Sequence, residues 1–232
     1  MSLIELKNIE KKYKNKLVLE DISLSINEGE AVAFLGKNGA GKTTLVEIIA
    51  KFTNPTKGEV IINIEENQKQ EIGIQFQEGN WPTGLCANDI LSFYYSVFPK
   101  FTKDHFDKLD ETFDIKNFLK TPLNKLSGGQ KQRFNALLSV VNNPKIIILD
   151  ELTTGLDLEL QFKIINFFKN QIKNNKTLLI VSHHPEEVEK LCDRLILVDK
   201  NHIILDQPVK QVQNSYGSVR NLMEEFYKGN IS

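Results

Sequence analysis

The sequence predicts an α/β fold with a mostly parallel sheet, and three observations support this prediction. Short apolar segments alternate with amphipathic ones along the 232 residues, as in domains whose helices cover a parallel sheet. The apolar segment Ala31–Leu35 runs directly into a glycine-rich segment, residues 36–43. No repeat, low-complexity segment or linker divides the chain. We therefore expect a single α/β domain, and its length is sufficient to bury a core.

Composition and charge exclude several classes of protein. The chain is 41% hydrophobic and 25% charged, with 29 basic and 30 acidic residues, which is typical of a globular protein. This balance argues against a nucleic-acid partner, because such proteins usually carry a basic excess. No apolar segment approaches the roughly 20 residues of a transmembrane helix, and the N-terminus lacks the features of a signal peptide. Cys86 and Cys192 are far apart in the sequence, which indicates a reducing, cytoplasmic compartment.

The elements of the core follow from hydrophobic periodicity. Uninterrupted apolar segments of four or five residues predict buried strands, and apolar residues spaced by three and four predict helices. In chain order we expect a helix at 43–50, a strand at 146–149, a helix through Leu160, Ile164, Phe167 and Phe168, a strand at 177–181, a helix beginning at Pro185, strands at 195–198 and 202–205, and a short amphipathic helix through Val219, Leu222, Met223, Phe226 and Tyr227.

The segment from about Glu78 to Lys125 differs from the rest in its aromatic content. It holds nine of the 20 aromatic residues in 48 positions, about twice an even share. Its spacing predicts two helices, one with Ile90, Leu91, Phe93, Tyr94, Val97 and Phe98 on one face and a stop at Pro99, and one with Phe106, Leu109 and Phe113 after a Thr102 cap. We interpret the segment as a helical insertion, most of whose aromatic residues fill its own small core.

Residues 36–43, Gly-Lys-Asn-Gly-Ala-Gly-Lys-Thr, match the phosphate-binding pattern GxxxxGK[ST] between a strand and a helix. Glycines allow successive N–H groups to turn toward phosphate oxygens, and the helix N-terminus adds its positive dipole. Lys42 is expected to reach the β- and γ-phosphates, and the Thr43 hydroxyl to bind Mg²⁺. The expected nucleotide-binding residues are Gly36, Lys37, Asn38, Gly39, Ala40, Gly41, Lys42, Thr43 and Thr44.

Two acidic residues, Asp150 and Glu151, end the predicted strand at 146–149. Asp150 at a buried strand tip is suited to hold Mg²⁺ through water, and Glu151 to polarise an attacking water as general base. The phosphate-binding loop at 36–43 (the P-loop) and these carboxylates are together compatible with three classes of protein: kinases, GTPases and motor ATPases.

The string Leu126-Ser127-Gly128-Gly129-Gln130, twenty positions before Asp150, resembles the signature of the ATP-binding cassette (ABC) family. The resemblance extends along almost the whole chain. Tyr13 lies where the family has an aromatic that stacks on adenine, Gln77 matches the Q-loop glutamine, residues 153–157 match the D-loop with Asp157 at its end, and His183 matches the switch histidine.

The resemblance implies the P-loop NTPase fold of ABC ATPases, with an N-terminal antiparallel β subdomain and a helical subdomain inserted into the core. It divides the single domain into a nucleotide-binding core at 1–80 and 141–205, a helical subdomain with the signature at 81–140, and a short helical tail at 206–232. ATP and Mg²⁺ are the implied ligands. In the family, Gln77 contacts Mg²⁺ and the lytic water, and His183 contacts the γ-phosphate.

The resemblance also implies two protein partners. Ser127 and the glycines of the signature precede a helix expected to begin near Gln130, which provides a second anion-binding terminus. In the family, the signature closes on the nucleotide of a second subunit, here expected to be an identical copy. The other partner is a separate membrane permease, which places the chain in the cytoplasm on the inner face of the membrane. The short tail resembles exporter-type cassettes of drug, peptide or bacteriocin-immunity systems. The alternative is a soluble ATPase without a transport role, such as one of iron–sulfur cluster assembly; an ATP-dependent kinase has no use for the signature.

Two positions depart from the family pattern. Leu152 replaces the usual proline after the catalytic glutamate, and His184 replaces the usual aspartate after the switch histidine. These changes concern the rigidity of the D-loop and the pH behaviour of the switch, and they remove no phosphate or metal contact. Arg133, one helical turn after Gln130, has two open interpretations: a role in the signature helix, or a surface salt bridge.

Overall fold

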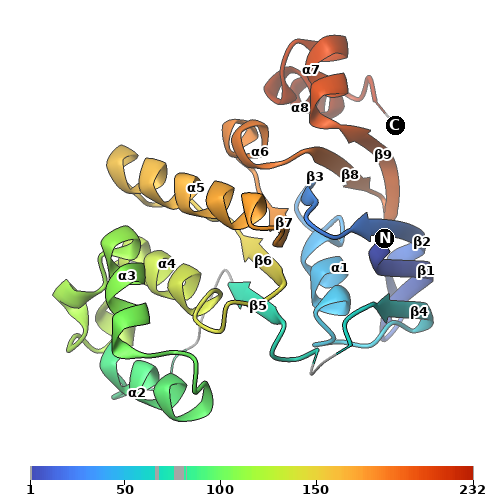
Figure 1. Cartoon of the computed structure of the whole chain (residues 1–232). Helices are drawn as coiled ribbons and strands as arrows, with labels where there is room; N and C mark the ends of the chain where they lie inside the picture. Colours follow the sequence, from blue (N-terminus) through green and yellow to red (C-terminus); the bar gives the residue numbers. More distant parts are fainter. Residues whose placement is uncertain (1, 66–67, 76–80, 82, 232) are drawn as a thin grey trace.

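Two β-sheets form the framework of the molecule (Figure 1). The computed structural model describes residues 2–65, 68–75, 81 and 83–231. Within these residues, one sheet has three strands in the order β2-β1-β4 and the other has six in the order β5-β6-β7-β3-β8-β9. The strands are β1 (Ser2–Tyr13), β2 (Lys16–Asn27), β3 (Ala31–Gly36), β4 (Lys57–Ile62), β5 (Ile72–Gln75), β6 (Ile146–Asp150), β7 (Thr177–Val181), β8 (Arg194–Asp199) and β9 (His202–Pro208).

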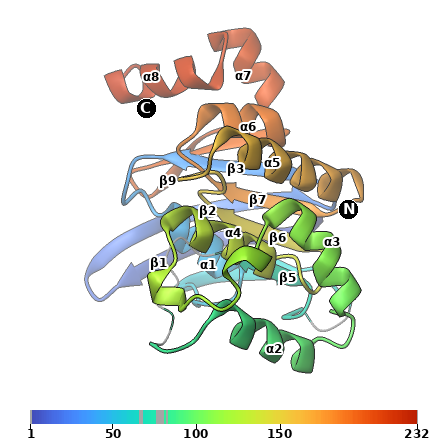
Figure 2. The ribbon, with the colours of Figure 1, turned by 90° about the vertical axis from the view of Figure 1, so that its left-hand side faces the viewer.

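Helices cover the sheets and form a separate group at one end (Figures 1 and 2). They are α1 (Lys42–Ile49), α2 (Ala87–Val97), α3 (Lys103–Phe113), α4 (Gly128–Leu138), α5 (Leu158–Lys173), α6 (Pro185–Leu191), α7 (Val209–Tyr216) and α8 (Val219–Lys228), with short 3-10 helices at Lys116–Phe118 and Leu123–Lys125. Among the described residues, we find no helix with the length and apolar character needed to span a bilayer.

The six-stranded sheet is parallel except for β9, which pairs with β8 in the antiparallel sense. Strand β3 lies between β7 and β8, and Phe34 of β3 is paired with Val181 at the end of β7. Strand β6 also ends beside β7, where Asp150 is paired with Val181. The chain therefore leaves β3, β6 and β7 at one edge of the sheet, which confirms the predicted mostly parallel sheet and brings three loops together.

The period-two alternation of β3 divides the core into two layers. Val32 and Phe34 belong to the cluster that joins α1 to the antiparallel sheet, whereas Ala33 and Leu35 belong to the cluster on the other face, together with residues of α5 and α8. Every residue of β3 is buried, as expected for a strand covered on both faces. Helix α1 therefore lies between the two sheets (Figure 1), and its N-terminus is held at the edge where β3 ends.

Helices α2, α3 and α4 gather beside β5, at the end of the large sheet away from β9 (Figures 1 and 2). Their aromatic core is partly as expected, with Phe101, Phe106, Phe113 and Phe118 buried. Phe93 is 60% exposed and Val97 is also exposed, so the prediction of one apolar face for α2 is wrong at these positions. The six apolar residues cover too wide an arc of this short helix for all of them to face inward.

Two further boundaries differ from the sequence prediction. Helix α4 begins at Gly128 rather than near Gln130, because the Ser127 hydroxyl accepts a hydrogen bond from the Gln130 amide (3.2 Å) and caps the helix. Helix α7 lies in the predicted helical tail at 206–232, but it was not predicted as a separate helix. It buries only Val209 and Val212, too few apolar residues to give a clear helical period.

Candidate functional site

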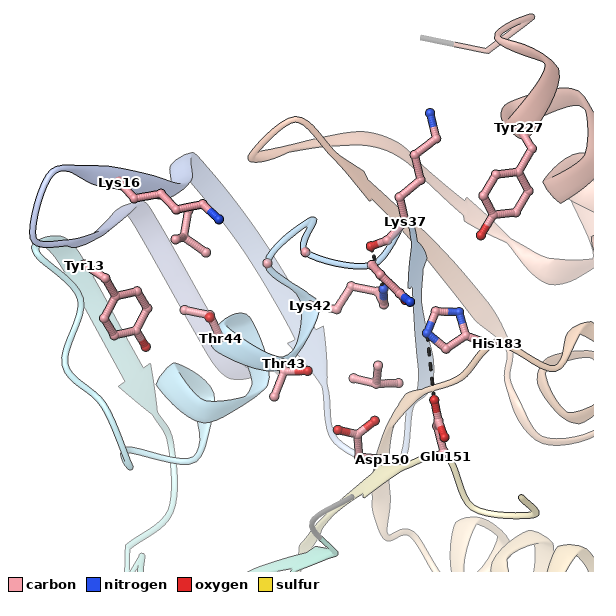
Figure 3. A pocket seen from close by; sticks show the side chains of 15 residues that line it. Tyr13, Lys16, Lys37, Lys42, Thr43, Thr44, Asp150, Glu151, His183 and Tyr227 are labelled. Carbon is pink, nitrogen blue, oxygen red and sulfur yellow. Dashed lines mark hydrogen bonds and ion pairs between the residues drawn. The ribbon is translucent and has the colours of Figure 1, made fainter. Parts of the chain in front are cut away.

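A cavity of about 760 Å³ opens at the carboxyl ends of β3, β6 and β7 (Figure 3). This is the edge of an open parallel sheet at which ligands usually bind. The cavity is lined by Tyr13, Lys16, Val18, Lys37, Asn38, Gly39, Gly41, Lys42, Thr43, Thr44, Asp150, Glu151, Val181, His183 and Tyr227. The structure thus brings most of the P-loop, the two strand-end carboxylates, the histidine after β7 and Tyr13 into one place.

The P-loop reaches α1 through Gly41, which has a φ of 102° and occupies the N-cap position. A Cβ atom there would lie 2.7 Å from Leu19 Cδ2 and 2.8 Å from the Val18 carbonyl oxygen, so the loop requires glycine for both its conformation and its space. Gly41 has no side chain to cap α1. The first amides of the helix are therefore available to an anion in the cavity.

Lys42 is the buried cation of the cavity. Its Nζ donates to the carbonyl oxygens of Gly36 (2.8 Å) and Lys37 (2.9 Å). Burial lowers the pKa of Lys42, while the charges of Asp150 and Glu151 oppose that effect. The P-loop carbonyls thus hold the ammonium group in the lining of the cavity.

Asp150 and Glu151 differ in environment although they are adjacent. Asp150 is 7% exposed, and burial, together with the charge of Glu151, raises its pKa to about 6. Glu151 adopts a left-handed backbone conformation with φ 55°, and its backbone amide donates to the Val181 carbonyl oxygen (2.9 Å). Its own carbonyl accepts from the Gln132 side chain. These backbone contacts direct the Glu151 side chain into the cavity (Figure 3).

His183 faces Glu151 across the cavity, with 3.9 Å between His183 Nε2 and Glu151 Oε1. Burial and the positive charge of Lys42 lower the pKa of His183, although Glu151 acts in the opposite direction. The imidazole is therefore neutral near pH 7. A neutral histidine beside the Glu151 carboxyl group is suited to orient water or a phosphate oxygen through hydrogen bonds.

The two departures from the family pattern have clear structural positions. Leu152 is completely buried in the core, so it anchors the start of the loop that follows Glu151. His184 lies with its Nε2 3.3 Å from the Thr154 hydroxyl, and that hydroxyl is 3.5 Å from Glu151 Oε2. His184 therefore contacts the D-loop rather than the cavity.

Two tyrosines border the cavity on opposite sides of the P-loop (Figure 3). Tyr13, 45% exposed, ends β1, and the Lys11 ammonium lies 4.8 Å from its ring centroid. Tyr227, 55% exposed, comes from α8 and directs its hydroxyl toward the cavity (Figure 3). Next to it, Phe226 lies under the Lys37 ammonium at 4.9 Å, so α8 contacts the P-loop directly.

Sequence reasoning did not place Tyr227 at this site. It assigned Tyr227 to the apolar face of the last helix, whereas only Val219, Leu222, Met223 and Phe226 are buried there. Val18 of β2 was missed as well, since it belongs to no motif, and Lys16, interpreted from the sequence as part of a solvated basic turn, also lines the cavity. The helical spacing shows that α8 must pack against something, but it carries no information that α8 returns to a loop nearly 190 positions earlier.

Several predicted site residues lie outside this cavity. Ser127 and Gln130 form a reciprocal cap, because Gln130 Oε1 also accepts from the Ser127 amide (2.9 Å). The signature is packed against the D-loop, and a Cβ on Gly129 would come within 2.6 Å of the Gly155 carbonyl oxygen. Asp157 caps α5 by accepting from the Leu160 amide (2.9 Å). Gly36, Ala40 and Gly128 do not line the cavity either, and Gln77 lies outside the described residues.

The contacts of Arg133 bear on its two interpretations, a role in the signature helix and a surface salt bridge. Its guanidinium is buried and donates to Asp114 Oδ2 (2.8 Å) and to the Asp114 and Phe113 carbonyl oxygens (2.9 and 3.3 Å). Arg133 therefore joins the signature helix α4 to the end of α3, through a salt bridge between a buried guanidinium and the half-exposed Asp114 carboxylate, so each interpretation holds in part.

The oxygen groups of the cavity fit a magnesium ion that is held mainly by its nucleotide. Thr43 offers a hydroxyl and Asp150 a carboxylate on the same wall. The described residues contain no cluster of three or more histidine, cysteine, aspartate or glutamate side chains suited to a metal. Mg²⁺ usually binds through one or two protein oxygens, phosphate oxygens and water, and this donor set meets that requirement.

Comparison with known proteins identifies the relatives of the chain. A family profile described as "ABC transporter" matches residues 19–154. A phosphonates import ATP-binding protein of Mesoplasma florum is 34% identical, over 92% of this chain and 97% of that protein. A Nod factor export ATP-binding protein of Burkholderia orbicola is 30% identical, over 88% of this chain and 70% of that protein. A dimeric ATP-binding cassette in a post-hydrolysis state, bound to ADP and Pi, superimposes with a TM-score of 0.78 and 27% identity, over 88% of this chain and 98% of that chain.

Proposed function

Because the chain belongs to the ABC transporter family as an ATP-binding, ATP-hydrolysing subunit, we propose that it drives a separate membrane permease with ATP hydrolysed at the cavity beside α1. The observation that carries the proposal is the meeting of Lys42, Asp150, Glu151 and His183 in one cavity at the carboxyl edge of the parallel sheet. Lys42 is proposed to bind phosphate, Asp150 to bind the metal, Glu151 to act as the base and His183 to contact the γ-phosphate, which together are the roles that hydrolysis requires.

The geometry supports a specific placement of ATP. The adenine stacks on Tyr13, and the triphosphate extends along the P-loop to the N-terminus of α1, where amides and the helix dipole stabilise its negative charge. Lys42 exchanges its two carbonyl contacts for β- and γ-phosphate oxygens. Thr43 and Asp150, with Gln77, would hold Mg²⁺, which would neutralise phosphate charge when bound.

Hydrolysis then requires an activated water on the open side of the γ-phosphate. Glu151 takes a proton from this water as its oxygen bonds to the γ-phosphorus and the bond to the β–γ bridging oxygen breaks, giving ADP and inorganic phosphate. His183, neutral and 3.9 Å from Glu151, donates a hydrogen bond to the γ-phosphate and keeps the water between the two residues. The acid–base step therefore uses groups already facing each other.

A second copy of the chain is proposed to complete the site. The signature Ser127–Gln130 caps α4 outside the cavity of its own subunit, so it is free to present that helix terminus to a nucleotide bound elsewhere. Closure of two copies, P-loop against signature, encloses each γ-phosphate. Hydrolysis removes the phosphate that bridges the halves and allows them to separate.

We propose that the chain consists of a core at 1–80 and 141–205, a helical subdomain at 81–140 and a tail at 206–232. The permease is proposed to contact the helical subdomain. A groove of about 240 Å³ between β5 and the helices supports this contact; Phe52, Ile72, Tyr94, Phe98 and Leu138 are among its lining residues. An amphipathic cytoplasmic helix of the permease fits such a groove. Through this contact the subunit works at the cytoplasmic face of the membrane.

Export is the direction we propose, in the drug, peptide or bacteriocin-immunity class. The Nod factor export relative supports it, although the phosphonates import relative shares the same core. Export predicts that a labelled substrate accumulates in inside-out membrane vesicles and does not accumulate in right-side-out vesicles. The alternative role in iron–sulfur cluster assembly has no support from the family or from these relatives.

Replacing Glu151 with Gln tests the proposed chemistry. Loss of the general base is expected to reduce ATP turnover by roughly 10²–10⁴-fold, while ATP binding persists and ATP-bound dimers accumulate in size-exclusion chromatography. The control is Glu159→Gln, at an exposed carboxylate of α5, which is expected to hydrolyse ATP normally. Unchanged turnover in Glu151→Gln would show that another group is the base.

A further inference from the structure

A buried carboxyl group lies directly behind the site and belongs to none of the groups assigned above. Glu187 of α6 is 2% exposed and does not line the cavity. Burial raises the pKa of Glu187, and such a group persists in a core only where its neighbours compensate for the lost water. Its neighbours come from two different loops, both of which carry residues of the proposed site.

The first neighbour is Ser182, the completely buried residue between β7 and His183. The Ser182 hydroxyl donates to Glu187 Oε2 and accepts a hydrogen bond from the His184 backbone amide (3.0 Å). Glu187 therefore fixes the orientation of the Ser182 hydroxyl, which in turn holds the backbone of the turn through His183.

The second neighbour is Thr153, two positions after Glu151. Its hydroxyl and backbone amide face the Glu187 carboxyl and favour the charged form, which lowers the pKa of Glu187 against the effect of burial. Glu187 Oε1 nevertheless completes no hydrogen bond of normal geometry. Thr153 of the D-loop is thus close enough to act on the carboxyl, whose Oε1 has no other hydrogen-bond partner among the described residues.

A parallel contact joins the same two loops at the surface. His184 Nε2 lies 3.3 Å from the Thr154 hydroxyl, so adjacent D-loop threonines meet adjacent parts of the switch segment. Leu152 is fixed in the core, so these two contacts act on the part of the loop that follows a buried anchor.

We propose that Glu187 is a positioning residue that holds the Glu151 loop and the His183 turn in register, through Thr153 on one side and Ser182 on the other. The proposal rests on the proposed ATPase function. The contacts of Glu187 with both loops supply a restraint on the D-loop, which lacks the usual proline after Glu151.

The experiment measures steady-state ATP hydrolysis by the full chain. Glu187→Ala is expected to reduce kcat at least 10-fold with KM for ATP within about 2-fold of wild type, since misplacement of catalytic groups by about 1 Å can cost 10²-fold in rate. Glu187→Gln preserves an oxygen acceptor and the shape, and is expected to restore most of kcat. Glu186→Ala, on the exposed side of the same helix, is the matched control and is expected to keep wild-type kcat.

Thr153→Val provides a second variant if Glu187→Ala does not fold, because it removes one hydroxyl at nearly constant volume. A lowered kcat in Thr153→Val would support action through Thr153. Where Glu187→Ala does fold, the absence of a further loss in the double variant would support it independently. Wild-type kcat in folded Glu187→Ala or Thr153→Val, or equal losses in the Ala and Gln variants of Glu187, would overturn the inference. Absence of ATPase activity in the wild-type chain would instead overturn the proposed function.

Discussion

Burial of charge distinguishes individual residues of the site from the rest of the surface. Lys42 and Asp150 are both almost inaccessible to water, and burial is the first cause of the shifted pKa of each. A ligand of opposite charge stabilises such groups beyond what their protein neighbours provide. The free protein therefore bears a cost at the positions where triphosphate and metal are proposed to bind.

This cost gives a pH-dependent prediction for Asp150. Its pKa rises from 3.8 to about 6 in the folded protein, so between these values the folded chain binds the proton more tightly than the unfolded chain does. The free energy of unfolding therefore falls as pH rises from about 4 to about 6, by on the order of 3 kcal/mol in total. Asp150→Asn is expected to be more stable than wild type at pH 7.5, with the difference vanishing near pH 4.

Urea denaturation of the nucleotide-free protein at pH 4, 5, 6 and 7.5 measures this effect. Asp104→Asn, at an exposed aspartate of α3, serves as control and is expected to follow the wild-type pH dependence. A constant difference between Asp150→Asn and wild type across the range would contradict the assignment of the shift to Asp150.

Tyr227 gives a second prediction at this scale. Its ring and hydroxyl border the cavity from α8, so Tyr227→Ala is expected to weaken ATP binding by a factor of about 3–10, as for the loss of an aromatic contact. Tyr227→Phe separates the hydroxyl from the ring. Fluorescent-nucleotide titration gives the affinities, with Glu224→Ala on the same helix expected to bind as wild type; equal affinity in all three variants would remove Tyr227 from the site.

Helix α4 depends on a contact made from its middle, at Arg133, as well as on the cap at its N-terminus. The reciprocal cap of Ser127 and Gln130 begins the helix, but Arg133 ties it to the end of α3 through three acceptors and lies over the Phe118 ring at 5.2 Å. The orientation of the signature terminus therefore depends on the helical region, the part proposed to receive the permease.

Breaking this contact is expected to destabilise the chain substantially. Arg133→Met leaves the Phe113 and Asp114 carbonyl oxygens without a partner, at a cost of about 2–4 kcal/mol, measured as a lower midpoint of urea denaturation. Arg220→Met is the matched control, since Arg220 pairs with Glu186 at an exposed position and exposed ion pairs contribute little. Equal midpoints for the two variants would show that the Arg133 contact is not a structural tie.

The whole molecule holds only part of the proposed site. The cavity contains the P-loop, Asp150, Glu151 and His183, whereas the signature lies outside it. In the proposed arrangement a second copy completes the cage around the γ-phosphate, so activity per subunit is expected to fall on dilution, because dimers dissociate.

Ser127→Arg tests this arrangement. The added side chain would clash with a second subunit, so ATP-dependent dimers and turnover are expected to be lost, while ATP binding to the monomer changes less than about 3-fold. Analytical ultracentrifugation in the Glu151→Gln background measures the dimer, with Ser96→Arg in α2 as a charge-matched control. Normal dimerisation of the Ser127→Arg variant would contradict closure on the signature.

The sequence alone determined the parallel core, the P-loop and the family. Each of these depends on local order: uninterrupted apolar strands, glycine at positions such as Gly41, and motif strings whose residues are adjacent in the chain. For the same reason the capping role of Thr102 was predicted and is present in the structure, where its hydroxyl accepts from the His105 amide.

Only the tertiary structure decided which distant residues meet. The return of α8 to the P-loop, the burial of Arg133 against the end of α3, the exposure of Phe93 and the position of Glu187 between two loops all depend on contacts between segments far apart in the sequence. Periodicity gives the face that an element buries and leaves its partner open, because any apolar surface of suitable shape satisfies the hydrophobic effect. The partner is chosen when all the elements pack together, and that choice brings Tyr227 to the proposed ATP site and Glu187 behind it.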